Sequence, residues 1–87
     1  MTHLVSYDLN RPGQKYPELF AAIENLGSVQ KILKSAWLVD STLKTADIFQ
    51  RLWATMDATD HLFVNELTTD WKEHVGPKAT EWLERYA

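Results

Sequence analysis

The chain has 87 residues, and its 9 basic and 12 acidic side chains give a formal net charge of −3. This length predicts a single domain over residues 1–87. The sequence contains no cysteine, which excludes a disulfide framework and a thiolate metal site within it. It has no apolar run long enough for a membrane span, and residues 1–8 lack the pattern of a signal peptide. We therefore expect a cytoplasmic protein with no membrane partner.

The charge is spread unevenly along the chain. Residues 1–51 carry six Lys/Arg against five Asp/Glu, a balance of +1, whereas residues 52–87 carry three against seven, a balance of −4. Proteins that bind nucleic acid without sequence preference usually carry a strong basic excess, because neutralising phosphates supplies most of their affinity. Contact with nucleic acid would therefore depend on a local patch in the N-terminal half.

The first half of the chain reads as strand, helix, strand and strand. Residues 3–9 are rich in strand-forming side chains, and residues 10–13 form a strong turn signal. A helix follows, with Pro17 in its first turn, Gly27 just past its end, and an apolar stripe at helical spacing made of Tyr16, Leu19, Phe20, Ile23 and Leu26. Residues 28–33 and 36–40 are predicted strands, and the two-residue link between them predicts a hairpin.

The second half reads as helix, strand and helix. Residues 45–56 carry a helical apolar stripe, with Thr45 as a candidate N-cap. The loop 57–60 leads into a predicted strand at residues 61–67, and Gly76 and Pro77 open a last helix. The order β, α, β, β, α, β, α predicts an α+β fold. We expect a ferredoxin-like βαββαβ antiparallel sheet with two helices on one face and an additional C-terminal helix.

The predicted strands are apolar on both faces. A sheet covered on one face only alternates apolar and polar residues. Here, by contrast, the strands contain three adjacent apolar pairs, namely Leu4 and Val5, Trp37 and Leu38, and Leu62 and Phe63. The second face therefore needs a cover. The C-terminal helix and a second copy of the chain are the two candidates, and they are compatible with each other. We favour a homodimer, with Trp37 and Leu38 at its interface.

Asp8, at the end of the first predicted strand, is the main candidate for chemistry. A carboxylate on a strand end can bind a divalent cation such as Mg²⁺, and two copies facing each other across a dimer axis would make a better site than one. Bound Mg²⁺ could activate water and stabilise charge on a phosphodiester. The commoner alternative is that Asp8 accepts hydrogen bonds from turn amides.

Several segments resemble a known family. Residues 4–10, LVSYDLN, precede a Pro-Gly turn, and the similarity continues through residues 35–39, 57–64, 70–71 and 82–83. In this ordered set the chain resembles the SinR-like small proteins, which are grouped with the CRISPR-associated adaptation nuclease that partners the CRISPR integrase. Residues 29–31, VQK, depart from that pattern, because they lack the aromatic residues expected there.

The resemblance implies a ferredoxin-like homodimer whose sheets face each other. It also implies that Asp8 lies near the dimer axis and takes part in Mg²⁺-dependent cleavage of RNA or DNA, with Ser35 as a contact to phosphate. Members of the wider group vary in activity, and some act as structural adaptors. Fold is therefore carried over more securely than catalysis.

The remaining polar and aromatic residues are weaker candidates. A nucleic-acid contact would use the polar and basic side chains of the N-terminal half, namely Asn10, Arg11, Lys15, Lys31, Lys34, Ser35 and Lys44. A solvated surface is the alternative for the basic residues. His3, His61 and His74 lack metal-type spacing and are interpreted as scattered surface histidines, none of them an evident acid–base partner. Trp71 is a candidate stacking residue, and the alternative is that it caps the edge of the sheet.

Two functional hypotheses remain open. The first is a non-catalytic homodimeric scaffold or binding module for protein or nucleic acid. The alternative is a Mg²⁺-dependent endonuclease with Asp8 of both subunits at the dimer axis. The sequence has no Gly-rich phosphate loop, no nucleophile elbow and no cysteine nucleophile, which excludes the other common catalytic plans.

Overall fold

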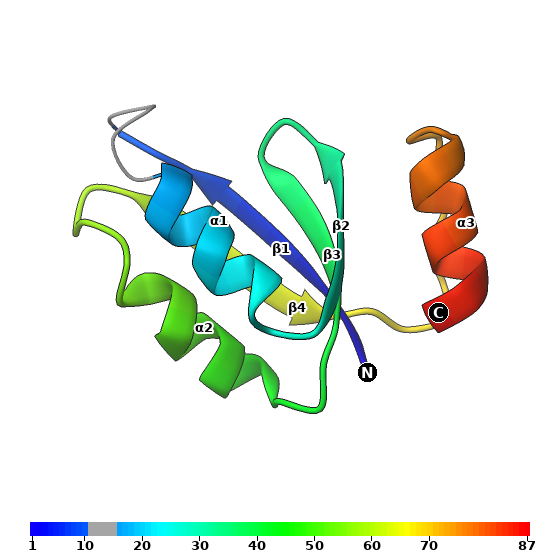
Figure 1. Ribbon diagram of the computed structural model, residues 1–87, viewed down its shortest axis with the longest axis horizontal. Helices are drawn as coiled ribbons and strands as arrows, with labels where there is room; N and C mark the ends of the chain where they lie inside the picture. The colour runs from blue at the N-terminus through cyan, green and yellow to red at the C-terminus, as the bar shows by residue number, and fades with distance from the viewer. Residues whose placement is uncertain (11–15) are drawn as a thin grey trace.

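The computed structural model describes residues 1–10 and 16–87, which form four strands and three helices in the order β1, α1, β2, β3, α2, β4, α3 (Figure 1). The strands are β1 (Thr2–Asp8), β2 (Ser28–Leu33), β3 (Ala36–Asp40) and β4 (His61–Glu66). The helices are α1 (Tyr16–Glu24), α2 (Thr45–Trp53) and α3 (Pro77–Tyr86). None of the described helices is long and apolar enough to cross a membrane.

The four strands form one antiparallel sheet in the order β2-β3-β1-β4. Val5 in the central strand β1 lies opposite Trp37 of β3 on one side and Val64 of β4 on the other. Helices α1 and α2 cover one face of the sheet, and α3 lies on the other side (Figure 1). The predicted α+β fold, a ferredoxin-like sheet with two helices on one face and an additional C-terminal helix, is confirmed.

The main core lies between the sheet and helices α1 and α2. Alternate residues of β1 point into it, and with the buried side of each helix they form one cluster that includes Val5, Tyr7, Leu19, Ile23, Ile48 and Leu52. Trp37 belongs to this cluster: its side chain is 8% exposed, and its indole N–H donates to the Tyr7 hydroxyl at 3.1 Å. Trp37 is therefore core of its own chain, which argues against its predicted place at a dimer interface.

A smaller core lies on the opposite face, beneath α3. Leu38 packs there against Trp82 and Leu83. The Trp82 indole N–H also donates to the Ser28 hydroxyl at 3.2 Å, which fixes the helix over β2 and β3. Of the two predicted covers for this face, the C-terminal helix of the same chain occupies the part around Leu38. Leu38 is 3% exposed, so it too has little surface left for a second copy.

Most element boundaries lie within a few residues of the prediction. Strand β1 runs one residue earlier than expected at each end, and β4 ends at Glu66. Helix α2 ends at Trp53 instead of residue 56, because the chain continues into tight turns in which Met56 N–H donates to the Trp53 carbonyl. Thr45 is not the N-cap: Lys44 occupies that position with an extended backbone and no capping side-chain hydrogen bond.

At Gly27 a close approach between two parts of the backbone requires the absence of a side chain. Its φ of 155° lies in the region that favours glycine, and a Cβ there would collide with the backbone carbonyl of Asp40. The predicted position just past α1 is thus explained by a close approach between the start of β2 and the end of β3.

Candidate functional site

Asp8 is the last residue of β1, and its side chain is exposed. Because Val5 and Tyr7 point toward α1 and α2, the alternation along the strand turns Asp8 to the opposite face of the sheet. Helix α3 is anchored at the other end of that face, where the Thr2 hydroxyl donates to the Tyr86 carbonyl at 3.2 Å. The end of the face that carries Asp8 is therefore accessible.

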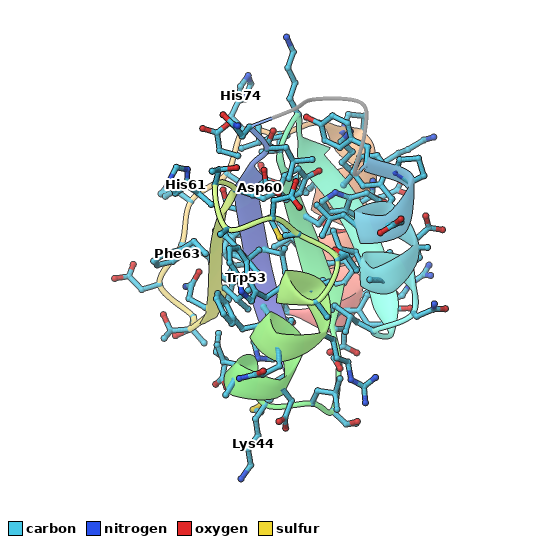
Figure 2. All side chains as sticks on the ribbon, turned by 90° about the vertical axis from the view of Figure 1, so that its left-hand side faces the viewer. Lys44, Trp53, Asp60, His61, Phe63 and His74 are labelled. Carbon is cyan, nitrogen blue, oxygen red and sulfur yellow. The ribbon has the colours of Figure 1, made fainter. Side chains whose placement is uncertain are left out.

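His61 lies directly opposite Asp8 on the neighbouring strand β4. Directly opposed residues of an antiparallel pair point to the same face, so the imidazole and the carboxylate share the accessible surface. Figure 2 shows His61 and Phe63 on the side of β4 away from α2, whereas Trp53 lies toward it. His61 is exposed, as predicted for a surface histidine, but the sequence did not indicate that it lies opposite Asp8. The spacing of 53 residues along the chain gave no signal of this pairing.

A buried carboxylate holds this end of the sheet together. Asp60 is 4% exposed, and its two oxygens accept hydrogen bonds from the backbone N–H groups of Asn10 and Asp57, each at 2.8 Å. The first bond ties the residue just before β4 to the chain just after β1. Asp60 therefore fixes Asp8 and His61 relative to each other. The sequence predicted only a loop at residues 57–60, although two Asp residues three apart in a loop are typical of side-chain-stabilised turns.

The two side chains border a shallow hollow. Its volume is about 330 Å³, and its lining includes Ser6, Asp8, His61 and Phe63. Phe63 is 64% exposed, the largest exposed fraction among the large apolar side chains described. The accessible surface around Asp8 therefore combines one carboxylate, one imidazole, one hydroxyl and one aromatic ring. We call these four residues the Asp8 surface.

The Asp8 carboxylate is a suitable type of ligand for a divalent cation, but one carboxylate is too few ligands to form a site. Carboxylate oxygens are ligands that Mg²⁺ prefers, and an exposed position lets the ion keep several waters. Among the residues that the structure describes, no group of three or more His, Asp or Glu side chains is arranged to hold a metal ion. One chain offers Asp8 and His61 at this place, so further protein ligands would have to come from a second copy.

The structure brings some of the predicted nucleic-acid residues to the same end of the sheet. The Tyr7 N–H donates to the Ser35 carbonyl at 3.0 Å, which places the turn containing Lys34 and Ser35 beside the end of β1. Asn10 is held there by Asp60. These three residues and Asp8 therefore lie at one end of the molecule.

The other predicted contacts do not join this group. Lys31 lies on the α1 side of the sheet, with its ammonium 5.0 Å from the centre of the Phe20 ring. Lys44 lies at the opposite end of the molecule from His61 (Figure 2). Arg11 and Lys15 fall outside the described residues. In the described part of the chain, Asn10, Lys34 and Ser35 therefore lie together, and Lys31 and Lys44 lie apart from them.

His3 is buried, which corrects its prediction as a surface histidine. It is 0% exposed, and neither ring nitrogen has a hydrogen-bond partner of good geometry within the described residues. Burial lowers the pKa of His3 below its ordinary value of 6.5, opposed by the carboxylate of Glu66 on the neighbouring strand. The buried ring is therefore neutral near pH 7 and belongs to the core.

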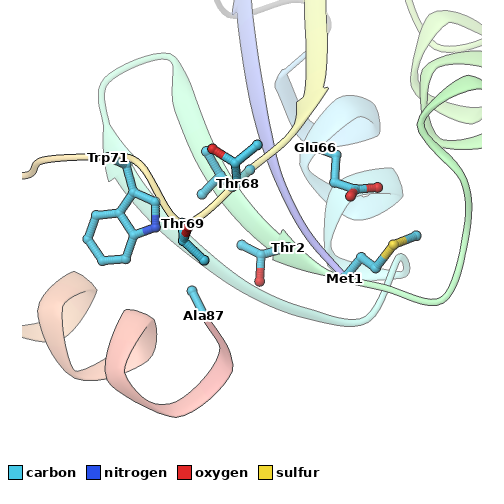
Figure 3. Close-up of a pocket in the computed structure, with 8 residues that line it drawn as sticks. Met1, Thr2, Glu66, Thr68, Thr69, Trp71 and Ala87 are labelled. Atoms are coloured by element: carbon cyan, nitrogen blue, oxygen red, sulfur yellow. The ribbon is translucent and has the colours of Figure 1, made fainter.

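Trp71 lines a separate hollow at the far end of the sheet from Asp8. The cavity has a volume of about 370 Å³, and Figure 3 shows Trp71 beside Thr68 and Thr69, with Met1 and Glu66 at its other wall. The indole is 37% exposed and could stack on a planar group. Trp71 also lines a second hollow, of about 320 Å³, together with Ser6 and Ala36, so it lies beside the part of the Asp8 surface that Ser6 forms.

Comparison with known proteins supports the fold and a broad relationship. No protein-family model matches the chain, and no curated protein matches it significantly. Among solved structures, the crystal structure of Streptococcus pyogenes Cas2 at pH 6.5 superposes with a TM-score of 0.68 and 26% sequence identity. The superposition covers 87% of this chain and 100% of the Cas2 chain. The chain is therefore similar to a CRISPR-associated protein, whereas the finer SinR-like grouping stays a prediction.

Proposed function

We propose that this protein is a Cas2-like homodimeric module that acts as a non-catalytic scaffold for a protein or nucleic-acid partner. The observation that carries the proposal is the Asp8 surface, which α3 leaves uncovered and in which Phe63 is 64% exposed. The similarity to Cas2 supports a CRISPR-associated role.

Phe63 is the residue that most favours association. Phe63 lies on the edge strand β4, and its phenyl ring is 64% exposed, which is unfavourable in water. Contact with an identical surface would bury two such rings. A two-fold contact places the same patch of each copy against the other, which also brings the two Asp8 carboxylates toward the axis. In this proposal the dimer interface forms around Phe63 and not around Trp37 and Leu38, the residues predicted from sequence.

Sedimentation equilibrium of the wild type beside Phe63→Lys and Phe49→Lys tests the dimer. Phe49 is also exposed, at 36%, but it lies on α2 and so on the other side of the sheet. We expect a dimeric wild type, a folded monomer for Phe63→Lys and an unchanged dimer for Phe49→Lys. A monomeric wild type, or a Phe63→Lys variant that stays dimeric, would refute the proposed interface.

The second candidate is a Mg²⁺-dependent endonuclease, and the accessibility of Asp8 favours it. Asp8 of both subunits would hold the ion, and Lys34, Ser35 and Asn10 lie at the same end to contact phosphate. When bound, Mg²⁺ supplies activation of water and neutralises charge on the phosphodiester. Asp8 is the group whose removal separates this candidate from the scaffold, because the scaffold needs only the surface shape.

Cleavage of labelled single-stranded RNA and double-stranded DNA with Mg²⁺, run beside Asp8→Ala, distinguishes the two candidates. Cleavage by the wild type that is lost in a dimeric Asp8→Ala variant would establish the nuclease. No cleavage by either protein would leave the scaffold. Equal cleavage by both would indicate a contaminating nuclease and would also count against Asp8 as a catalytic residue.

A further inference from the structure

We propose that His61 is a metal ligand alongside Asp8, and that this pair binds a divalent first-row transition ion more tightly than Mg²⁺. The proposal rests on the metal site of the second candidate function and names the ion for which that site is built.

The first support is geometric. Asp8 and His61 are paired residues of adjacent antiparallel strands, and their side chains lie on the same face. Directly opposed residues have Cβ atoms about 4.5–5.5 Å apart, a separation from which an aspartate oxygen and an imidazole nitrogen can both reach one ion at about 2.0–2.2 Å. Both residues are exposed and border the same hollow, so an ion can enter from solvent.

The second support is the rigidity of the pair. A preorganised site needs ligands whose relative position is held by their surroundings. The hydrogen bond from Asn10 N–H to Asp60, at 2.8 Å, connects the two strands beside the pair. Asn10 lies two residues after Asp8, and Asp60 lies immediately before His61. The pair is thus held both by the sheet and by a buried carboxylate, and it does not depend on a loop.

The third support is the chemistry of the donor set. Mg²⁺ binds oxygen ligands almost exclusively, whereas imidazole nitrogen suits ions such as Zn²⁺ and Ni²⁺. For a mixed nitrogen and oxygen site the affinity of divalent first-row ions generally rises toward the end of the series. An imidazole placed beside a carboxylate therefore disfavours Mg²⁺ relative to Co²⁺ or Zn²⁺.

The number of ligands gives a stoichiometry. One chain supplies one oxygen and one nitrogen ligand at this place, which is fewer than the four protein ligands of a closed tetrahedral site. In a dimer with the Asp8 surfaces together, two carboxylates and two imidazoles are available. We therefore expect one tightly bound ion for every two chains.

Titration with CoCl₂ and, separately, MgCl₂ tests the proposal by calorimetry at constant pH, on protein without a histidine tag. Visible absorption reports Co²⁺ coordination directly. The proteins are the wild type, Asp8→Ala, His61→Ala, the size-conserving His61→Gln, and His74→Ala as the control for an exposed histidine outside the Asp8 surface. Far-UV circular dichroism checks that each variant is folded.

We expect Co²⁺ affinity to fall at least about tenfold in Asp8→Ala and in both His61 variants, since loss of a ligand should cost no less than loss of a supporting residue. His74→Ala should bind as the wild type does, and Mg²⁺ binding should be weaker than Co²⁺ binding in the wild type. Unchanged Co²⁺ affinity in the His61 variants with weakened binding in Asp8→Ala would refute the role of His61 and leave the Asp8 site intact. Unchanged affinity in all variants would refute both.

Discussion

The buried carboxylate of Asp60 offers the sharpest test of how this end of the sheet is held. In Asp60→Ala, the backbone N–H groups of Asn10 and Asp57 both lose the acceptor that now lies 2.8 Å away. Hydrogen bonds to a charged group contribute about 1.5–3 kcal/mol each, and water can replace part of that for Asn10, which is exposed. We expect a loss of about 3 kcal/mol in the free energy of unfolding.

Urea unfolding followed by tryptophan fluorescence measures that loss. Asp60→Asn keeps one acceptor oxygen but turns an amide NH₂ toward the second N–H group, so about half of the loss should remain. Asp70→Ala is the matched control, because this carboxylate is exposed in the segment before α3 and its removal should change stability by less than about 0.5 kcal/mol. If Asp60→Ala were no less stable than Asp70→Ala, the account of Asp60 as the connection between β1 and β4 would be refuted.

Three further predictions concern the core and the site. Because burial lowers the pKa of His3 below 6.5, the unfolded state takes up a proton that the folded state does not, so stability is fully present above pH 6.5 and is lost as pH falls below it. His3→Leu should show a smaller loss between neutral and acidic pH in urea unfolding, and an equal loss in both proteins would contradict this role. Trp82→Ala should cost about 3 kcal/mol in the same assay and expose the segment from Leu67 onward to proteolysis, since Trp82 is 7% exposed beneath α3. Asp8→Ala should change stability by less than about 0.5 kcal/mol, because the side chain is exposed at a strand end, and a loss of several kcal/mol would mark Asp8 as structural.

Local patterns predicted the elements because each element carries its own signal. The apolar stripe of α1, including Leu19 and Ile23, appears in the sequence at helical spacing and is buried as expected. Errors in the predicted positions arose where a local sequence signal disagreed with the tertiary arrangement of the chain. Thr45 looked like a cap, but the extended residue before the helix is Lys44, whose side chain makes no capping hydrogen bond.

The faces of the strands were harder to predict than the strands themselves. Trp37 and Leu38 were correctly recognised as pointing to opposite faces, yet both were assigned to an interface. In the structure Trp37 packs in the core beneath α1 and α2, and Leu38 packs beneath α3. A sequence pattern indicates that an apolar side chain must be buried, but it does not indicate which helix, strand or second chain buries it.

The sequence by itself determined the order of the elements and the ferredoxin-like arrangement, because periodicity and turn signals act between near neighbours in the chain. It also singled out Asp8 as a candidate, from its place at a strand end and from the family resemblance. Only the tertiary structure decided that His61 stands opposite Asp8, that Asp60 connects the two strands, and that α3 leaves Phe63 uncovered. These relationships join residues some fifty positions apart through strand register. A shift of one residue in that register would turn His61 to the other face, so the candidate site exists only through the pairing of β1 with β4.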